Sequence, residues 1–204
     1  MKFILGTKQN MTEYFSEDGK VHPATIVTAG PIVVTQVKTK ETDGYTALQV
    51  GYGTRKAKNI TKSVKGHMGE GSYAELCEFV VSAEQAGGMK KGDAITAGTF
   101  AVGDEVAVSG ISKAKGFQGV IKRHNFKGGP RSHGQKHSER APGSIGGGLR
   151  NRVPKGMRMG GRTGGDRITV SNLKILAVDA DTNTLLISGA VPGRRGTMLE
   201  IVQK

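Results

Sequence analysis

Short runs of β-branched and apolar residues, broken by glycine-containing turns, occupy both ends of this 204-residue chain. Residues 24–28 and 32–39 form two such runs, and Gly30-Pro31 between them is typical of a turn. Further strands are expected at 45–52, 105–111, 168–170, 173–178, 184–191 and 199–202, and short helices near 59–65 and 73–79. Many short strands with glycine-rich turns predict a mainly β protein, with a small closed β-barrel body and one or two short helices.

The middle of the chain, residues 113–167, lacks this pattern. Its bulky apolar residues are sparse and follow neither the helical nor the strand period. Fourteen of the 32 glycines fall in these 55 residues, and glycine loses more conformational entropy on folding than any other residue. We therefore expect one domain, 1–204, in which 1–112 and 168–204 form the body. Residues 113–167 are expected to form a long, basic, Gly-rich extension loop between two strands.

The charge of the protein is concentrated in the same middle segment. Residues 113–167 contain fourteen Lys and Arg against two Asp and Glu, which gives net +12. The remaining residues contain sixteen cations and fifteen anions, net +1, and the two parts add up to the net +13 of the chain. Lys and Arg neutralise phosphates and release counterions, while glycine lets backbone N–H groups approach phosphates closely. The segment therefore predicts nucleic-acid binding.

A disordered basic linker is the simpler alternative for this segment. Its internal position and the Phe, Ile and Met residues scattered through it favour a functional loop instead. The candidate RNA-binding residues are its basic and aromatic side chains: Lys113, Lys115, Phe117, Lys122, Arg123, His124, Phe126, Lys127, Arg131, His133, Lys136, His137, Arg140, Arg150, Arg152, Lys155, Arg158, Arg162 and Arg167.

The sequence offers no catalytic, cofactor or metal site. Residues 129–136 resemble a phosphate-binding loop, but Gln135 stands where such a loop needs lysine. His133 and His137 have the spacing of metal ligands on a helix, yet the glycine between them, Gly134, argues against a helix. We expect a protein that is not an enzyme, with no metal, no cofactor and no small-molecule substrate. No apolar stretch approaches the roughly 18 residues of a membrane span, so no membrane partner is expected.

The chain has a single cysteine, Cys77. It lies among apolar residues, so a buried role as a small apolar side chain is expected. With no second cysteine an intramolecular disulfide is impossible, which suits a reducing compartment.

Several sequence blocks occur together in an order that is specific to one protein family. They are Gly6-Thr7-Lys8, Met11-Thr12, 43–51, Gly66-His67, 110–119, 122–126, His133-Gly134, 142–146, 159–161, 167–170 and 189–193. In this order they resemble the bacterial-type universal ribosomal protein L3 (uL3) family of the large ribosomal subunit. The resemblance runs over essentially the whole chain.

The resemblance implies a structural protein that binds large-subunit (23S-type) rRNA, acts early in subunit assembly and extends its loop toward the peptidyl-transferase centre. The implied partners are this rRNA and neighbouring large-subunit ribosomal proteins. The implied location is the cytoplasm, in a bacterial-type ribosome, and an organellar ribosome remains open. His124 departs from the family, which commonly has Trp there, although a His ring can still stack on a base. The alternative function is a free RNA chaperone or translational regulator on the same fold.

Overall fold

The structure, a computed structural model, describes residues 1–69, 71–148 and 151–203. It is mainly β, which confirms the predicted class. The described chain divides into two compact units. The first, which we call the body, contains 1–111 and 167–204, and the second, which we call the loop unit, contains Ser112–Asp166.

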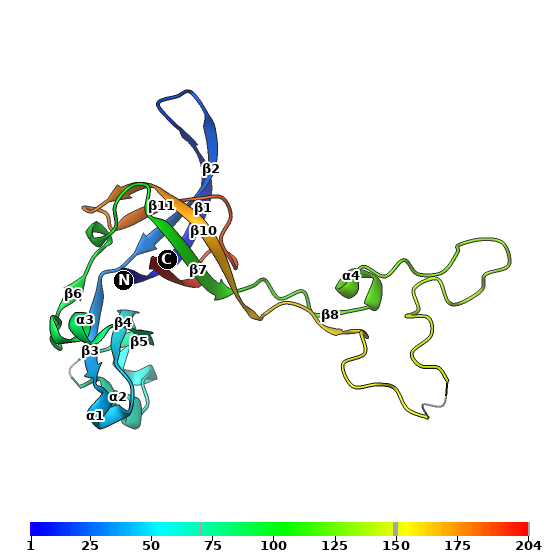
Figure 1. The fold of residues 1–204 in the computed structure, drawn as a ribbon, viewed down its shortest axis with the longest axis horizontal. Helices are drawn as coiled ribbons and strands as arrows, with labels where there is room; N and C mark the ends of the chain where they lie inside the picture. Colours follow the sequence, from blue (N-terminus) through cyan, green and yellow to red (C-terminus); the bar gives the residue numbers. More distant parts are fainter. Residues whose placement is uncertain (70, 149–150, 204) are drawn as a thin grey trace. The chain divides into compact units, whose positions relative to one another are not determined.

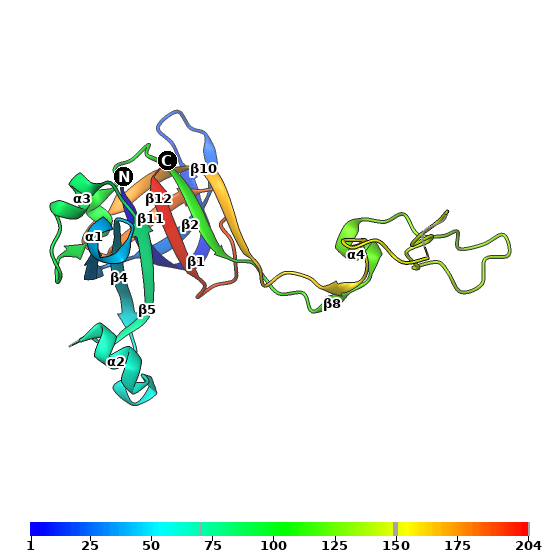
Figure 2. The ribbon, with the colours of Figure 1, turned by 60° about the horizontal axis from the view of Figure 1, so that its bottom comes forward.

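Six antiparallel strands of the body form a closed ring, in which each strand pairs with two neighbours and the last pairs with the first (Figures 1 and 2). In ring order they are β1 (Phe3–Phe15), β12 (Met198–Gln203), β7 (Glu105–Ile111), β10 (Arg167–Asp179), β11 (Thr184–Ser188) and β2 (Val21–Ala29). Closure leaves no unpaired edge along the paired lengths of these strands.

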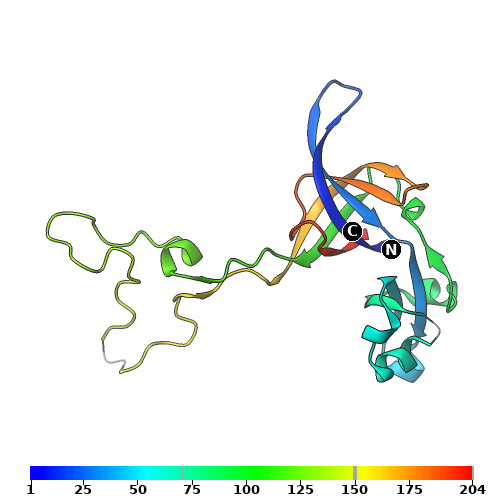
Figure 3. The same ribbon diagram turned by 180° about the vertical axis from the view of Figure 1, so that it is seen from behind.

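The β1–β2 hairpin continues beyond the ring as a two-stranded ribbon (Figure 3). β12 pairs with β1 only over Phe3–Thr7, whereas the pairing of β1 with β2 continues to the pair Phe15–Val21. Both side chains of this last pair are exposed. The ribbon therefore presents apolar side chains to solvent.

A second sheet of the body contains four strands in the order β5-β4-β3-β6. Their bounds are Tyr73–Val80 for β5, Ala47–Thr54 for β4, Ile32–Lys38 for β3 and Ala94–Ile95 for β6. Short helical segments connect them: α1 (Lys40–Asp43), η1 (Ala57–Asn59), α2 (Lys62–Met68) and α3 (Ala83–Gly87). A further one, η2 (Ala97–Thr99), leads from β6 to ring strand β7. No helix in the described residues is long and apolar enough to cross a membrane.

The chain passes from the ring to the second sheet at Gly30, between β2 and β3. Gly30 has φ +79°, and a Cβ built on it would lie 3.1 Å from Ile4 Cδ1 and 3.2 Å from the Ile95 carbonyl oxygen. Its N–H donates to the Leu5 carbonyl at 2.9 Å. Both the left-handed backbone and the close approach require glycine at this crossing.

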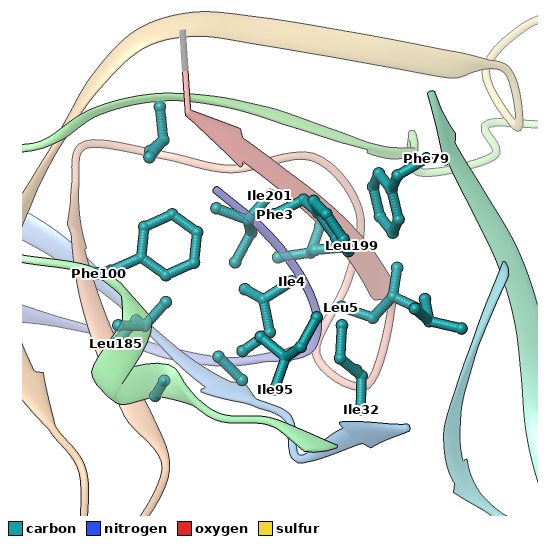
Figure 4. Close-up of a cluster of buried hydrophobic side chains, with 14 of the residues drawn as sticks. Phe3, Ile4, Leu5, Ile32, Phe79, Ile95, Phe100, Leu185, Leu199 and Ile201 are labelled. Carbon is teal, nitrogen blue, oxygen red and sulfur yellow. The ribbon is translucent and has the colours of Figure 1, made fainter. Parts of the chain in front are cut away.

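The ring and the second sheet share one hydrophobic core (Figure 4). Ile4, Leu185 and Ile201 come from ring strands and are fully buried. Phe3 of the ring stacks on Phe79 of β5 with 4.5 Å between ring centroids. Full burial of one such side chain stabilises a fold by about 1.5–3 kcal/mol, so the two sheets hold each other in place.

The predicted helix near 73–79 is wrong, because these residues form strand β5. The positions of Tyr73, Leu76 and Phe79 have a helical spacing, but β5 pairs with β4 from Tyr73–Thr54 to Val80–Ala47. This pairing satisfies the backbone of β5 along one edge and places Phe79 in the core. The other predicted helix, near 59–65, corresponds to α2, which begins at Lys62 and ends at Met68.

Candidate nucleic-acid interface

The loop unit begins with an irregular antiparallel stem, formed by 112–118 and 161–166. Ser112 N–H donates to the Asp166 carbonyl at 2.9 Å, and Lys115 N–H donates to the Thr163 carbonyl at 2.8 Å. The stem ends in the short pair β8 (Phe117–Gln118) and β9 (Gly161–Arg162). Backbone hydrogen bonds thus hold the two segments of the stem together.

A glycine with positive φ is required inside this stem. Gly164 has φ +74°, and a Cβ built on it would lie 2.1 Å from the Lys113 carbonyl oxygen. Neither the backbone conformation nor the available space admits a larger residue. At least one glycine of the basic segment is therefore needed for the two segments of the stem to pack closely.

Beyond the stem lies a five-residue helix, α4 (Val120–His124), which carries Lys122, Arg123 and His124 in its last turn. Arg123 Nη1 donates to the Met159 carbonyl at 3.0 Å, and His124 Nε2 lies 3.1 Å from the same oxygen. Because a carbonyl can only accept, His124 must carry its proton on Nε2 in this contact. Hydrogen bonds from the Arg123 and His124 side chains therefore link α4 to the segment around Met159, which leads into β9.

The next part of the loop unit forms a small subloop, 128–141. Gly129 N–H donates to the Glu139 carbonyl at 2.9 Å and closes the subloop. The Glu139 carboxylate accepts from Arg131 Nε at 2.7 Å. Gln135 Nε2 donates to Ser138 Oγ at 2.8 Å. Backbone and polar side-chain contacts, rather than apolar burial, give the subloop its shape.

The cations of the loop unit are turned toward solvent. Of the fourteen predicted in 113–167, Arg167 lies in β10 and Arg150 lies outside the described residues, which leaves twelve. All twelve are exposed: Lys113, Lys115, Lys122, Arg123, Lys127, Arg131, Lys136, Arg140, Arg152, Lys155, Arg158 and Arg162. Among the described residues of this unit, only Arg131 forms an ion pair, with Glu139. The unit therefore presents a dense positive surface with little internal neutralisation.

Arg167 differs from the other predicted RNA-binding residues in its surroundings. It is the first residue of β10, where it pairs with Ile111 of β7. Its guanidinium forms an ion pair with the Glu200 carboxylate of β12. The structure thus places Arg167 within the ring, with its charge opposed by a carboxylate.

Some of the predicted aromatic and histidine side chains are exposed, whereas two of them pack against each other. Phe117 in the stem is 78% exposed, so its ring is free to stack on a partner. The rings of His124 and Phe126 are tilted against each other, with 6.0 Å between centroids. His133 and His137 are exposed, and His133 has φ +58°. In the described residues, no three His, Cys, Asp or Glu side chains lie close enough together to hold a metal ion.

Two features of the loop unit do not follow from its charge pattern. Asn125 ends α4 in the left-handed conformation, with φ +59°, and Asn is a usual helix terminator. An Asn directly after a basic turn is the signal by which α4 could have been predicted. Thr163 Oγ1 is buried and has no hydrogen-bond partner in the described structure, and nothing in the sequence marks it.

Comparison with known proteins gives one consistent result. The family model described as "Ribosomal protein L3" matches residues 7–191. The chain is 43% identical over 201 residues to large ribosomal subunit protein uL3 of Herpetosiphon aurantiacus, covering 97% of this chain and 94% of the relative. It is 46% identical over 204 residues to uL3 of Finegoldia magna, covering 98% and 97%.

A third relative, uL3 of Dehalococcoides mccartyi, is 46% identical over 200 residues, with 97% of this chain and 96% of the relative covered. These matches include the body, which supplies the closed ring, and the loop unit with its exposed cations. They confirm the resemblance seen in the sequence blocks. This chain belongs to the ribosomal protein L3 family, a family of structural proteins of the large ribosomal subunit.

Proposed function

We propose that the protein binds large-subunit rRNA through residues 113–167, whose described part is the loop unit together with Arg167. The observation that carries this proposal is the exposure of all twelve described cations of the loop unit, of which one is paired with a carboxylate. Phosphate is the partner that such a surface fits, because each contact releases condensed counterions. The exposed Phe117 ring offers a stacking surface for an unpaired base.

The backbone arrangement of the loop unit supports the same proposal. The stem and subloop are held by backbone hydrogen bonds and glycine turns. Because glycine has no side chain, the backbone of such a loop is accessible, and RNA can approach it closely. Side chains that do not pack inside the unit remain available for phosphates.

The finer roles are proposed on the strength of family membership. The body, proposed as residues 1–112 and 168–204, acts as a small closed β-barrel that supports the loop. The protein takes part early in large-subunit assembly, and its loop extends toward the peptidyl-transferase centre. Neighbouring large-subunit ribosomal proteins contact it in a cytoplasmic, bacterial-type ribosome. Its role is structural, without catalysis, cofactor or metal.

The test is the salt dependence of binding to a transcribed large-subunit rRNA fragment. The variant replaces six exposed loop cations with Gln: Lys122, Arg123, Lys127, Arg131, Lys136 and Arg140. If all six neutralise phosphates, the log–log salt slope should become less steep by roughly 4, from a coefficient of about 0.7 per contact on irregular RNA. An unchanged slope and affinity would refute the proposal.

A free RNA chaperone or translational regulator on the same fold remains the alternative. Sedimentation separates the two functions. A structural subunit protein should migrate with large subunits after a high-salt wash, whereas a free regulator should remain at the top of the gradient.

A further inference from the structure

The near-neutral charge of the body conceals a second concentration of cations. Residues 55–69 contain Arg55, Lys56, Lys58, Lys62 and Lys65 and no Asp or Glu. All residues outside 113–167 sum to +1, so those outside both segments sum to −4. The positive charge of the body is therefore concentrated in residues 55–69, and the rest of the body has a net negative charge.

The structure arranges these residues as one exposed strip, which we call the α2 strip. It runs from the end of β4 through η1 to α2, and all five cations are exposed. None of the five forms an ion pair with a described residue. Lys91 adds a sixth charge, because its Nζ lies 3.8 Å from the position of a Cβ built on Gly69.

The α2 strip is held firmly to the second sheet. His67 Nε2 lies 2.9 Å from Gln49 Oε1, which also accepts from Thr35 Oγ1 at 2.9 Å. Gln49 is only 6% exposed, and its Nε2 donates to Glu78 at 3.2 Å. Met68, at the end of α2, is 5% exposed. A buried polar network and an apolar anchor thus fix α2, so that binding to the strip costs little ordering of the backbone.

A pocket is lined in part by residues of the strip. Its lining includes Arg55, Ile60, Val64, Met68 and Tyr73. Val64 is 41% exposed in this lining. The pocket thus places apolar side chains next to a cationic margin, a combination that suits a sugar–phosphate backbone more than a compact anion.

We propose that the α2 strip is a second RNA-binding site, which contacts the phosphate backbone independently of the loop unit. RNA is favoured over an acidic protein because six exposed cations, none in an ion pair with a described residue, match a regular array of phosphates, as the loop unit does on a larger scale. The proposal rests on the proposed function in one respect, that large-subunit rRNA is the natural source of this backbone. Two linked contacts on one RNA would increase the overall affinity through effective concentration.

The experiment uses the full-length protein and a matched control. The strip variant changes Lys56, Lys58, Lys62 and Lys65 to Gln. The control variant changes four exposed cations elsewhere in the body to Gln, and these are Lys20, Lys40, Lys174 and Arg195. Both variants lower the net charge by four, so only the position of the lost charge differs between them.

The strip variant should bind the rRNA fragment at least tenfold more weakly at 0.1 M salt. Its salt slope should be less steep by roughly 3, from about 0.7 per contact. The control should change both quantities much less. Equal losses in the two variants, or no loss in either, would overturn the proposal. Matching far-UV circular dichroism and melting temperatures establish that both variants are folded.

The six-cation loop variant, measured alongside, separates this proposal from the proposed function. A loss in the loop variant alone overturns the α2 strip and leaves the loop site standing. A loss in the strip variant alone does the reverse. Anionic phosphatidylserine vesicles provide the remaining arm. If the strip variant loses vesicle binding but keeps full rRNA affinity, the strip binds a membrane surface and the RNA site is refuted.

Discussion

Removal of the loop unit is expected to stabilise the body. Ile111 and Arg167 are paired residues of neighbouring antiparallel strands, so the chain leaves and re-enters the ring at one place. No described residue of 112–166 takes part in a strand pair of the ring. A four-residue turn, Gly-Asn-Gly-Ser, in place of Ser112–Asp166 therefore keeps every pairing of the ring.

The magnitude follows from the entropy of loop closure. Folding brings the ends of a 55-residue segment together, and the cost grows as (3/2)RT times the logarithm of the length. Shortening from 55 to four residues should raise the free energy of unfolding by about 2 kcal/mol. The remaining body has 111 plus 38 residues, 149 in all. For that size the melting temperature should rise by roughly 4–8 °C.

The assay is urea unfolding followed by far-UV circular dichroism, with thermal melts as a second measurement. A partial deletion that removes 126–158 leaves 22 residues of the segment and should give a gain of about 0.8 kcal/mol. The reasoning requires that stability rise in this order as the segment shortens. A shortened protein that unfolds without cooperativity, or is less stable than the full chain by 1 kcal/mol or more, would show that the loop unit supports the body.

Three further predictions concern titration, reactivity and proteolysis. Hydrogen bonds from Lys38 and Tyr45 hold the pKa of Glu78 below its usual 4.5. This stabilisation is present above about pH 4.5 and is lost as the pH falls through the lower folded value, so Glu78→Gln should destabilise the protein at pH 7 and progressively less in acid. Burial raises the pKa of Cys77 to about 11, so iodoacetamide at pH 8 should alkylate it at least tenfold faster in urea than in the folded protein. Trypsin should cut the free protein first within Arg131–Arg162, and first cleavage inside 24–52 would contradict the exposure of the loop cations.

The sequence predicts those features that depend on composition. The charge asymmetry marks 113–167, and strands such as β7 and β4 show alternating or β-branched patterns. β1 lacks such a pattern after Phe3-Ile4-Leu5, because its second half lies in the solvent-exposed ribbon, where polar residues alternate irregularly with the exposed Met11 and Phe15. Its strand conformation comes from pairing with β2, which no local pattern shows. β5 was predicted as a helix for the same reason, since pairing with β4 decided its conformation.

The candidate site is predictable to a similar extent. Charge alone selects the loop cations, and the twelve that the structure describes are exposed as the composition suggests. The contacts of α4 depend on the Met159 carbonyl, 35 residues after His124, and side-chain patterns carry no information on such backbone acceptors. The α2 strip is hidden by the near-zero sum of charges over the body, because a net charge does not distinguish one face from another. Arg167 has the charge of a loop residue but the position of a strand residue.

The ribbon at the end of the β1–β2 hairpin has a consequence for the protein before it meets its partners. A two-stranded ribbon has unpaired edges, and exposed edges with apolar side chains such as Phe15 invite strand addition by other chains. Pro23 has no backbone N–H to donate, and its carbonyl already accepts from Gly189 N–H at 2.7 Å, so an incoming strand cannot pair there. Glu13, directly opposite Pro23, and Glu17 near the tip repel a second copy of the same hairpin. The newly made protein can therefore expose the apolar end of this ribbon to water without pairing edge to edge with other copies.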